Sequence, residues 1–379
     1  MKIVNLCLCG PYNINWGYQE NLLSKYQEKN GNEVVVITSC FVNNKTGISL
    51  DYTDSGTCYD GNVKIIRLES KISKKFGMIF RMYKKLYESL EIEKPDFIFC
   101  HGLQFADAKI LVKYIKNHKN VRLVVDNHAD FTNTAKDFFG KLINKTLWKR
   151  SAKILEDCAD KFYGVLPARC DFLHEMYNIP KDKIELLIMG ADDEKICVSK
   201  TKKDLIREKL NIDIDTKLIV TGGKIDKYKK GVLNLMKVIN SIKDSKIILL
   251  IFGSIDSELE TEFYKNLTEP IIYKGWLNQD DIYDYLCASD LGVFPGRHSV
   301  IWEQAAGCGI PSIYLDLPNT KHIDINGNCV FIKNDSEDEI KQTLCDILND
   351  ENKFKQLKYN AELASKEFLY SEIAKKSIK

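Results

Sequence analysis

The stretch of sequence that decides the fold is residues 218–252, which read LIVTGGKIDKYKKGVLNLMKVINSIKDSKIILLIF. Its two ends, Leu218–Thr221 and Ile247–Phe252, are short apolar runs, and such runs predict buried strands. Strands that are apolar on both faces and separated by helices form parallel sheets covered on both sides. The stretch therefore predicts a doubly wound α/β domain.

The same alternation extends in both directions along the chain. Downstream, further strands are predicted at Ile271–Lys274, Leu291–Phe294, Ser312–Tyr314 and Cys329–Ile332. Upstream, a separate series is predicted at Ile3–Cys9, Glu33–Thr38, Val63–Leu68, Asp96–Cys100, Arg122–Val125 and Phe162–Val165. We predict two tandem Rossmann-like domains, residues 1–194 and residues 195–361. The polar, lysine-rich segment 195–204 is predicted to link them, and a C-terminal helix at about 362–379 to return to the first domain.

Composition narrows the classes of function. The chain has 379 residues, which suits two domains, and its net charge of +2 excludes nucleic-acid binding through a large basic surplus. The first 190 residues carry 28 basic and 22 acidic side chains, so the positive surplus lies in the first half. Twelve cysteines without a Cys-x-x-Cys pair are typical of reduced thiols in a core, and they indicate a reducing cytoplasm. The sequence contains no run of about 18 apolar residues that would predict a membrane span.

A loop rich in glycine and lysine follows the first strand of the second domain. It runs from Thr221 to Gly231 and includes Gly223, Lys224 and Lys230. Ligands of doubly wound sheets bind beyond the carboxyl ends of the strands. Glycine lets the backbone approach an anion, lysine supplies charge, and the next helix adds its amino-terminal dipole. The loop therefore predicts a diphosphate site, in preference to a solvated run of lysines.

The segment 295–311 of the same domain combines a loop and a helix. Ser299 is predicted to cap a helix that runs to about Gly307, and the free backbone amides there suit phosphate. Glu303 lies in this otherwise apolar helix, where a carboxylate needs a partner. Hydroxyl groups of a ligand are one possible partner, and an arginine or lysine from the neighbouring loop is the structural alternative.

Two histidines follow strands of the first domain. His101 follows the strand Asp96–Cys100, and His128 follows the next predicted strand. A histidine at the carboxyl end of a strand is well placed to contact a ligand, and the alternative is a half-buried structural histidine bonded to backbone. The two interpretations are balanced for His128, and the structural one is favoured for His101. Gly17 lies in the turn after the first strand, where a glycine serves either an anion or a plain turn.

Five segments, in order, span nearly the whole chain and carry a family resemblance. They are Trp16-Gly17-Tyr-Gln-Glu, the Asn127-His128 loop, Ile188-Met-Gly190-Ala-Asp192, Gly223-Lys224 followed by Lys230-Gly231, and Glu303-Gln-Ala-Ala-Gly-Cys-Gly-Ile-Pro311. Together they resemble the GT-B-fold glycosyltransferases of the retaining group 1, or family 4, type. The resemblance implies two Rossmann-like domains that face each other across a cleft, and a nucleotide-sugar donor, most simply a UDP-sugar.

The resemblance implies catalytic roles for three residues. His128 would face the reacting sugar, where it would hold a hydroxyl and stabilise positive charge at the anomeric carbon. Lys224 and Lys230 would hold the diphosphate and neutralise the leaving nucleotide. His101 and Asn127 would lie on the acceptor side.

The same resemblance implies a set of residues that bind the donor. Gly17 and Gly223 would lie beside the diphosphate, and the amides of Ser299 and Val300 would reach the phosphate. Glu303 would bind the ribose hydroxyls. No metal and no other cofactor would be required, because lysines and helix ends can stabilise the leaving group.

The sequence departs from the family pattern at two positions. Lys224 stands where the family usually has arginine, which loses a bidentate fork but keeps the charge. Pro295 stands where the family has a first glutamate, which contacts the donor sugar. We expect Arg297 and His298 to take over those contacts, because the loop must still pass near the sugar.

The predicted function is transfer of a sugar from a nucleotide sugar to a saccharide or lipid-linked saccharide, with retention, in surface polysaccharide or glycolipid biosynthesis. The alternatives are a nucleotide-sugar epimerase of the same fold and a non-catalytic sugar-binding relative. Residues 134–154 form a basic amphipathic pattern, which fits either contact with an anionic membrane or an ordinary exposed helix. Lys71–Lys85 repeats the basic pattern and favours the membrane contact. The predicted location is cytoplasmic, at the inner face of the cell membrane.

Overall fold

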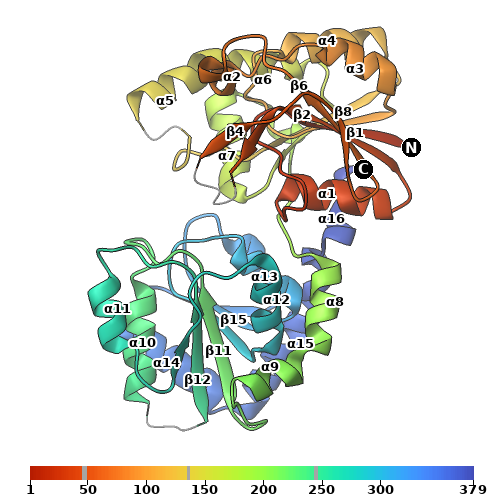
Figure 1. Cartoon of the computed structure of the whole chain (residues 1–379). Helices are drawn as coiled ribbons and strands as arrows, with labels where there is room; N and C mark the ends of the chain where they lie inside the picture. The colour runs from red at the N-terminus through yellow and green to blue at the C-terminus, as the bar shows by residue number, and fades with distance from the viewer. Residues whose placement is uncertain (45–48, 135–136, 243–245) are drawn as a thin grey trace. The chain divides into compact units, whose positions relative to one another are not determined.

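The computed structural model describes residues 1–44, 49–134, 137–242 and 246–379. It divides into two compact units (Figure 1), one formed by Met1–Ile188 with Ile373–Lys379 and the other by Met189–Glu372. The sequence prediction placed this division at residues 194 and 195. Each unit is a Rossmann-like α/β unit built on a mainly parallel sheet, so the predicted fold class is confirmed.

The sheet of unit 1 has the strand order β10-β9-β8-β7-β1-β2-β6-β5, parallel except for β5. Its strands are β1 (Lys2–Cys7), β2 (Glu33–Ser39), β5 (Gly56–Asp60), β6 (Val63–Leu68), β7 (Phe97–Cys100), β8 (Arg122–Asn127), β9 (Lys161–Gly164) and β10 (Ile184–Leu186). A separate antiparallel pair consists of β3 (Phe41–Asn43) and β4 (Leu50–Tyr52). The strands β3, β4, β5 and β10 were not predicted, because β3 has only three residues and the other three strands are short and largely exposed.

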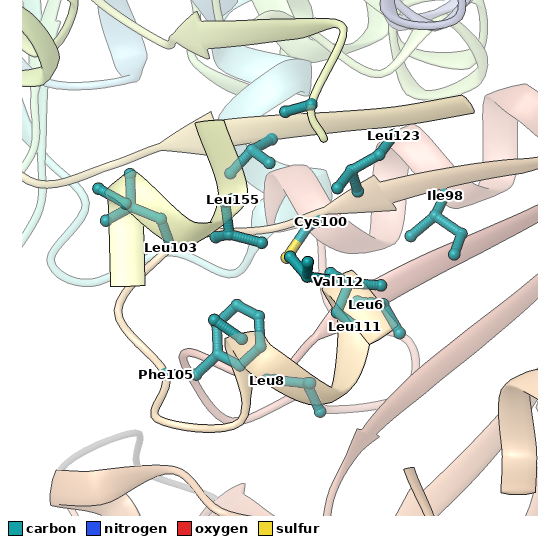
Figure 2. Close-up of a cluster of buried hydrophobic side chains, with 14 of the residues drawn as sticks. Leu6, Leu8, Ile98, Cys100, Leu103, Phe105, Leu111, Val112, Leu123 and Leu155 are labelled. Atoms are coloured by element: carbon teal, nitrogen blue, oxygen red, sulfur yellow. The ribbon is translucent and has the colours of Figure 1, made fainter. Parts of the chain in front are cut away.

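Helices join the strands of unit 1. They are α1 (Gln19–Lys29), α2 (Lys74–Phe80), α3 (Leu86–Glu93), α4 (Ala108–Asn117), α5 (Phe138–Ile143), a π-helical segment (Asn144–Trp148), α6 (Lys149–Glu156), α7 (Pro167–Tyr177) and the end of α16 (Tyr370–Ser377). The core lies between the sheet and the helices that cover it (Figure 2). Buried residues from the sheet, its loops and helices α4 and α6 meet there, among them Leu6, Leu8, Ile98, Cys100, Leu103, Phe105, Leu111, Val112, Leu123 and Leu155.

The sheet of unit 2 has the order β13-β12-β11-β14-β15-β16, and each described pairing is parallel. The strands are β11 (Lys217–Gly222), β12 (Ile247–Phe252), β13 (Ile271–Tyr273), β14 (Leu291–Phe294), β15 (Ser312–Leu315) and β16 (Cys329–Ile332). The helices are α8 (Asp193–Thr201), α9 (Lys203–Lys209), α10 (Gly231–Ser241), α11 (Glu260–Asn266), α12 (Gln279–Ala288), α13 (Ile301–Cys308), α14 (Glu337–Leu348) and α15 (Glu351–Ala364). Because β11 and β14 are neighbours, the loops after them share one edge of the sheet.

The segment predicted as a linker, residues 195–204, is instead part of helices α8 and α9 of unit 2. The Asp192 side chain caps α8, and both Ser199 and Lys202 bond to Asp284 of α12. Lys195, Lys202 and Lys203 of this segment therefore form ion pairs within unit 2. The returning C-terminal segment is also shorter than predicted, because only Ile373–Lys379 belongs to unit 1.

The basic amphipathic pattern of residues 134–154 forms α5, the π-helical segment and most of α6, although residues 135 and 136 lie outside the described residues. Its apolar side chains divide into two groups. Phe138 and Phe139 are 74% and 73% exposed, and Leu142 and Ile143 are also exposed. Leu147 and Ile154, together with Trp148, pack on the core of unit 1. In the described part of the chain, no helix is long and apolar enough to cross a membrane.

Candidate active site

The carboxyl ends of β1, β7 and β8 and the loops that follow them line a cavity of about 240 Å³ in unit 1. Its walls include Glu20 of α1, Arg81, and the two predicted histidines, His101 and His128. Arg81 donates to the carbonyl oxygens of Met78 and Gln104, so its guanidinium is held in place by backbone. The structure thus brings His101 and His128 together with the carboxylate of Glu20 and the guanidinium of Arg81.

A buried carboxylate joins the two histidines. His101 Nδ1 and His128 Nε2 each lie 3.1 Å from Asp126 Oδ2, while the backbone amide of Gly102 donates to Asp126 Oδ1 at 2.8 Å. Burial opposes ionisation of Asp126, but the two histidines and their hydrogen bonds hold its pKa well below the usual range. Burial also lowers the pKa of His128, and the charge of Asp126 outweighs this effect and raises it. His128 is therefore suited to act as a cationic hydrogen-bond donor.

Two other residues predicted for this half of the site lie outside the wall of the cavity. Asn127 is buried, and its side chain bonds to Gln104, to the backbone of Ala129 and to the carbonyl of Arg169. These contacts show that Asn127 holds its own loop together, and the acceptor-side role predicted for it stays a prediction. Gly17 lies in the loop that leads into α1, two residues before the helix begins.

The glycine-lysine loop of unit 2 turns a lysine inward that the sequence analysis did not select. Lys229 Nζ lies 3.4 Å from the carbonyl oxygen of Gly222 and 3.3 Å from Ser299 Oγ. Gly223 lies beside this amine with a φ of +101°, a backbone conformation that favours glycine. Burial lowers the pKa of Lys229 to about 8, which leaves the amine mostly protonated at neutral pH.

The predicted lysines Lys224 and Lys230 belong to the same loop but have exposed side chains. Arg297 comes from the loop after β14. Its backbone amide donates to the carbonyl of Tyr228, and its guanidinium lies 5.2 Å from the centre of the Tyr228 ring. The two loops predicted to bind the nucleotide therefore contact each other at the carboxyl edge of the sheet.

Glu303 is fully buried in α13, and two histidines share one of its oxygens. His298 Nε2 and His322 Nε2 lie 2.8 Å and 2.9 Å from Glu303 Oε1. Burial opposes ionisation, but the histidines lower the pKa of Glu303 to about 2, so the carboxylate is charged. Glu303 Oε2 is buried and has no hydrogen-bond partner among the described residues. Within the part of the chain that the structure describes, that oxygen is an acceptor without a donor.

The predicted partners of Glu303 were ligand hydroxyls or an arginine or lysine, and the observed partners are histidines. His298 was predicted to contact the donor sugar, but its Nε2 is already bound to Glu303. The predicted cap Ser299 is wrong by one residue, because α13 begins at Ile301 with Val300 in the capping position. The Ser299 hydroxyl contacts Lys229 instead, which draws it away from the helix amides.

Two sets of side chains bring ligand atoms close enough for a metal ion. Glu20, His101 and His128 form one set in unit 1, and His298, Glu303 and His322 form the other in unit 2, with the ligand atoms of each set within 4.8 Å of one another. Nitrogen and carboxylate donors of this kind suit zinc and similar transition metals. The expectation that the reaction needs no metal stays a prediction.

Sequence reasoning missed Asp126, Lys229 and His322. Asp126 stands two residues before His128, a spacing that places both side chains on one side of a chain leaving a strand. Lys229 is adjacent to the selected Lys230, and the sequence gives no means to choose between neighbouring lysines. His322 is 19 residues from Glu303 and offered no local signal.

Comparison with known families decides the class of protein. A model described as Glycosyltransferase Family 4 matches residues 21–195, and a model described as Glycosyl transferases group 1 matches residues 216–350. The chain is a GT-B-fold glycosyltransferase. This glycosyltransferase thus carries one family domain in each half of its sequence, in the order that the resemblance implied. A comparison with curated proteins found no match.

Solved structures share the fold of this glycosyltransferase along nearly its full length. HepE of Anabaena, in complex with UDP and glucose, matches with a TM-score of 0.65 and 12% identity over 99% of this chain and 98% of its own. WaaG, a glycosyltransferase involved in lipopolysaccharide biosynthesis, matches with a TM-score of 0.62 and 15% identity over 99% and 98%. A UDP-N-acetylglucosamine 2-epimerase described for Listeria monocytogenes matches with a TM-score of 0.61 and 14% identity over 99% and 94%. At these identities the likeness shows the fold alone.

Proposed function

We propose that this glycosyltransferase moves a hexose-type sugar from a UDP-sugar to a saccharide or lipid-linked saccharide, with retention of anomeric configuration. The observation that carries the proposal is the pair of neighbouring loops in unit 2, one with the inward amine of Lys229 and the other leading to the unpaired Oε2 of Glu303. A nucleoside diphosphate needs a cation for its phosphates and an acceptor for its ribose hydroxyls. HepE, which shares the fold, binds UDP.

The described contacts support a separate role for each of the side chains that would bind the donor. Lys229 offers positive charge to the leaving diphosphate, with Lys224 and Lys230 available from the exposed side of the same loop. Glu303 Oε2 accepts from the ribose, while Oε1 is held by the two histidines. His128 donates a hydrogen bond to a sugar hydroxyl. The negative charges of Asp126 and Glu20 would stabilise positive charge on the reacting sugar, whereas a cationic His128 would oppose it.

Release of free UDP from a panel of UDP-sugars, with and without saccharide and lipid-linked saccharide acceptors, tests the proposal. We expect acceptor-dependent release for one sugar, and a product whose anomeric proton coupling matches that of the donor. Arg297→Ala should change the ranking of sugars, because Arg297 stands in the loop that replaces the usual glutamate. Conversion of the UDP-sugar to its epimer without an acceptor would favour the alternative enzyme, for which Glu20 supplies a carboxylate on the cavity wall. Binding without turnover of any sugar would favour a non-catalytic relative.

We also propose that the enzyme contacts the inner face of the cell membrane through α5 and the segment after it, in surface polysaccharide or glycolipid biosynthesis. Figure 1 shows α5 at the edge of unit 1. Its exposed Phe138 and Phe139 supply apolar surface, and Lys141, Lys145 and Lys149 supply positive charge for anionic lipid.

Cosedimentation with vesicles of phosphatidylglycerol tests the membrane contact. Replacing both Phe138 and Phe139 by serine should weaken binding by roughly 10- to 100-fold, since each ring loses about 1 kcal/mol or more of apolar burial. Ile92→Ser, which removes an equally exposed apolar side chain from α3, is the control and should bind like the wild type. Equal binding of all three proteins, or equal binding to neutral phosphatidylcholine, would refute the contact.

A further inference from the structure

Both histidines of the unit 1 cavity bond to the same carboxylate, that of Asp126. It is fully buried at the end of β8, and its Oδ2 is the atom that lies 3.1 Å from each ring. Its Oδ1 is engaged by the backbone amide of Gly102, which fixes the carboxylate plane. Asp126 is fully buried and both of its oxygens accept hydrogen bonds from the protein, so we expect it to act on a substrate through the histidines.

The geometry sets the protons on both rings. An ionised carboxylate only accepts hydrogen bonds, so His101 Nδ1 and His128 Nε2 must each carry a proton. A neutral His101 then has a bare lone pair on Nε2. This atom is buried, and it has no hydrogen-bond partner among residues 1–44, 49–134, 137–242 and 246–379. A buried acceptor without a donor costs free energy unless a ligand supplies one.

We propose that Asp126 is a positioning residue, which orients His101 so that its Nε2 accepts a hydrogen bond from an acceptor hydroxyl and orients His128 so that its Nδ1 donates to a sugar. The proposal rests on the transferase function proposed above. Glu20 brings a carboxylate oxygen within 4.8 Å of a ring nitrogen of each histidine. His101 and Glu20 thus place two hydrogen-bond acceptors on one cavity, which suits an acceptor that carries two adjacent hydroxyl groups.

The charged and titratable groups around His128 come from several elements. They are Asp126 of β8, His101 after β7, Glu20 of α1, Arg81, and Arg169 of α7. Asp126 and Glu20 favour the cationic ring and Arg169 opposes it. The activity that depends on cationic His128 is present at low pH and is lost as the pH rises through its raised pKa. Removing the charge of Asp126 lowers that pKa and moves the alkaline limb of the kcat profile to lower pH.

Asp126→Asn is the test, because it keeps the size of the side chain and removes its charge. We expect kcat to fall by about 10- to 100-fold, the loss of a charge-assisted hydrogen bond, and the alkaline limb to move to lower pH. The dissociation constant of UDP should stay unchanged, since Lys229 and Glu303 are untouched. Asp130→Asn, a matched change in the same loop whose partners are Thr132, Asn133 and Arg169, should leave the limb in place.

His101→Gln keeps the proposal falsifiable if Asp126→Asn does not fold. It should raise the KM of the acceptor by about 10-fold or more and leave the alkaline limb where it is, because the Asp126–His128 contact remains. An unshifted limb in folded Asp126→Asn would overturn the proposal. A zinc content of one equivalent in the wild type that is lost in His101→Gln would also overturn it, because the histidines would then be metal ligands. A wild type that binds UDP but transfers no sugar would instead refute the proposed function.

Discussion

Alanine at position 128 is expected to lower kcat by roughly 10²–10³-fold, the effect of removing a preorganised donor that acts on the transition state. The reason is the contact of His128 with Asp126, which keeps the ring in one orientation on the wall of the cavity and favours its cationic form. Because the proposed partner of His128 is the sugar, UDP affinity should change by less than about threefold. Steady-state kinetics and calorimetric titration of UDP measure the two quantities separately.

His174→Ala is the matched control, because His174 is another histidine of unit 1 whose ring bonds to the carbonyl of Ile179 outside the cavity. It should keep wild-type kcat. If His128→Ala keeps its specific activity and melts at a lower temperature, then the alternative interpretation of His128 as a structural residue is correct. A large loss of UDP affinity in His128→Ala would contradict the separation of roles on which the prediction depends.

The fold could be predicted from the sequence because its strands are buried on both faces. Val34–Ile37 and Leu249–Ile251, for example, are almost completely buried, and such strands show as continuous apolar runs. The strands that the sequence did not reveal, β5 among them, have exposed alternate positions and polar residues. The segment 195–204 was wrongly predicted to be a linker, because it has few apolar positions and many lysines. Lys195 and Lys202 in fact form ion pairs with Asp280 and Asp284 of unit 2.

The candidate site could be predicted only in part, because its side chains come from loops whose path depends on tertiary contacts. The positions of His101 and His128 followed from a general rule about the carboxyl ends of strands, and the structure places both on one cavity. That a single carboxylate would join them required the register of β7 and β8, which pairs Cys100 with Val125. Sequence spacing alone carries no information on that register.

The partners of Glu303 in unit 2 could not be predicted from the sequence either. Its burial was expected from the apolar helix around it, and the need for a partner followed from physical chemistry. The partner His322 comes from a short 3₁₀ segment after β15, and no local pattern near Glu303 indicates it. A buried charge can therefore be recognised in a sequence well before the group that compensates it.

Lys229→Ala is expected to weaken UDP binding by about 10- to 150-fold, the equivalent of one charge-assisted hydrogen bond of about 1.5–3 kcal/mol. Lys229 Nζ is held between the Gly222 carbonyl and Ser299 Oγ, so its position is set before the ligand arrives. Lys224 and Lys230 are exposed and lose more side-chain freedom on binding, and their alanine variants should each cost less than the Lys229 variant. These two variants are matched controls of the same charge change in the same loop.

The pH dependence of UDP binding separates the inward lysine from its neighbours. Because burial lowers the pKa of Lys229 to about 8, its amine loses its proton as the pH rises through that value. Wild-type affinity for UDP should therefore decline above about pH 8, and the decline should be absent in Lys229→Ala and retained in Lys230→Ala. If Lys230 binds the diphosphate, as the sequence predicted, Lys230→Ala should instead lose more UDP affinity than Lys229→Ala. Titration calorimetry of the wild type and these two variants at pH 7 and pH 9 decides between the two lysines, because it is the Lys229 amine that lies between Gly222 and Ser299.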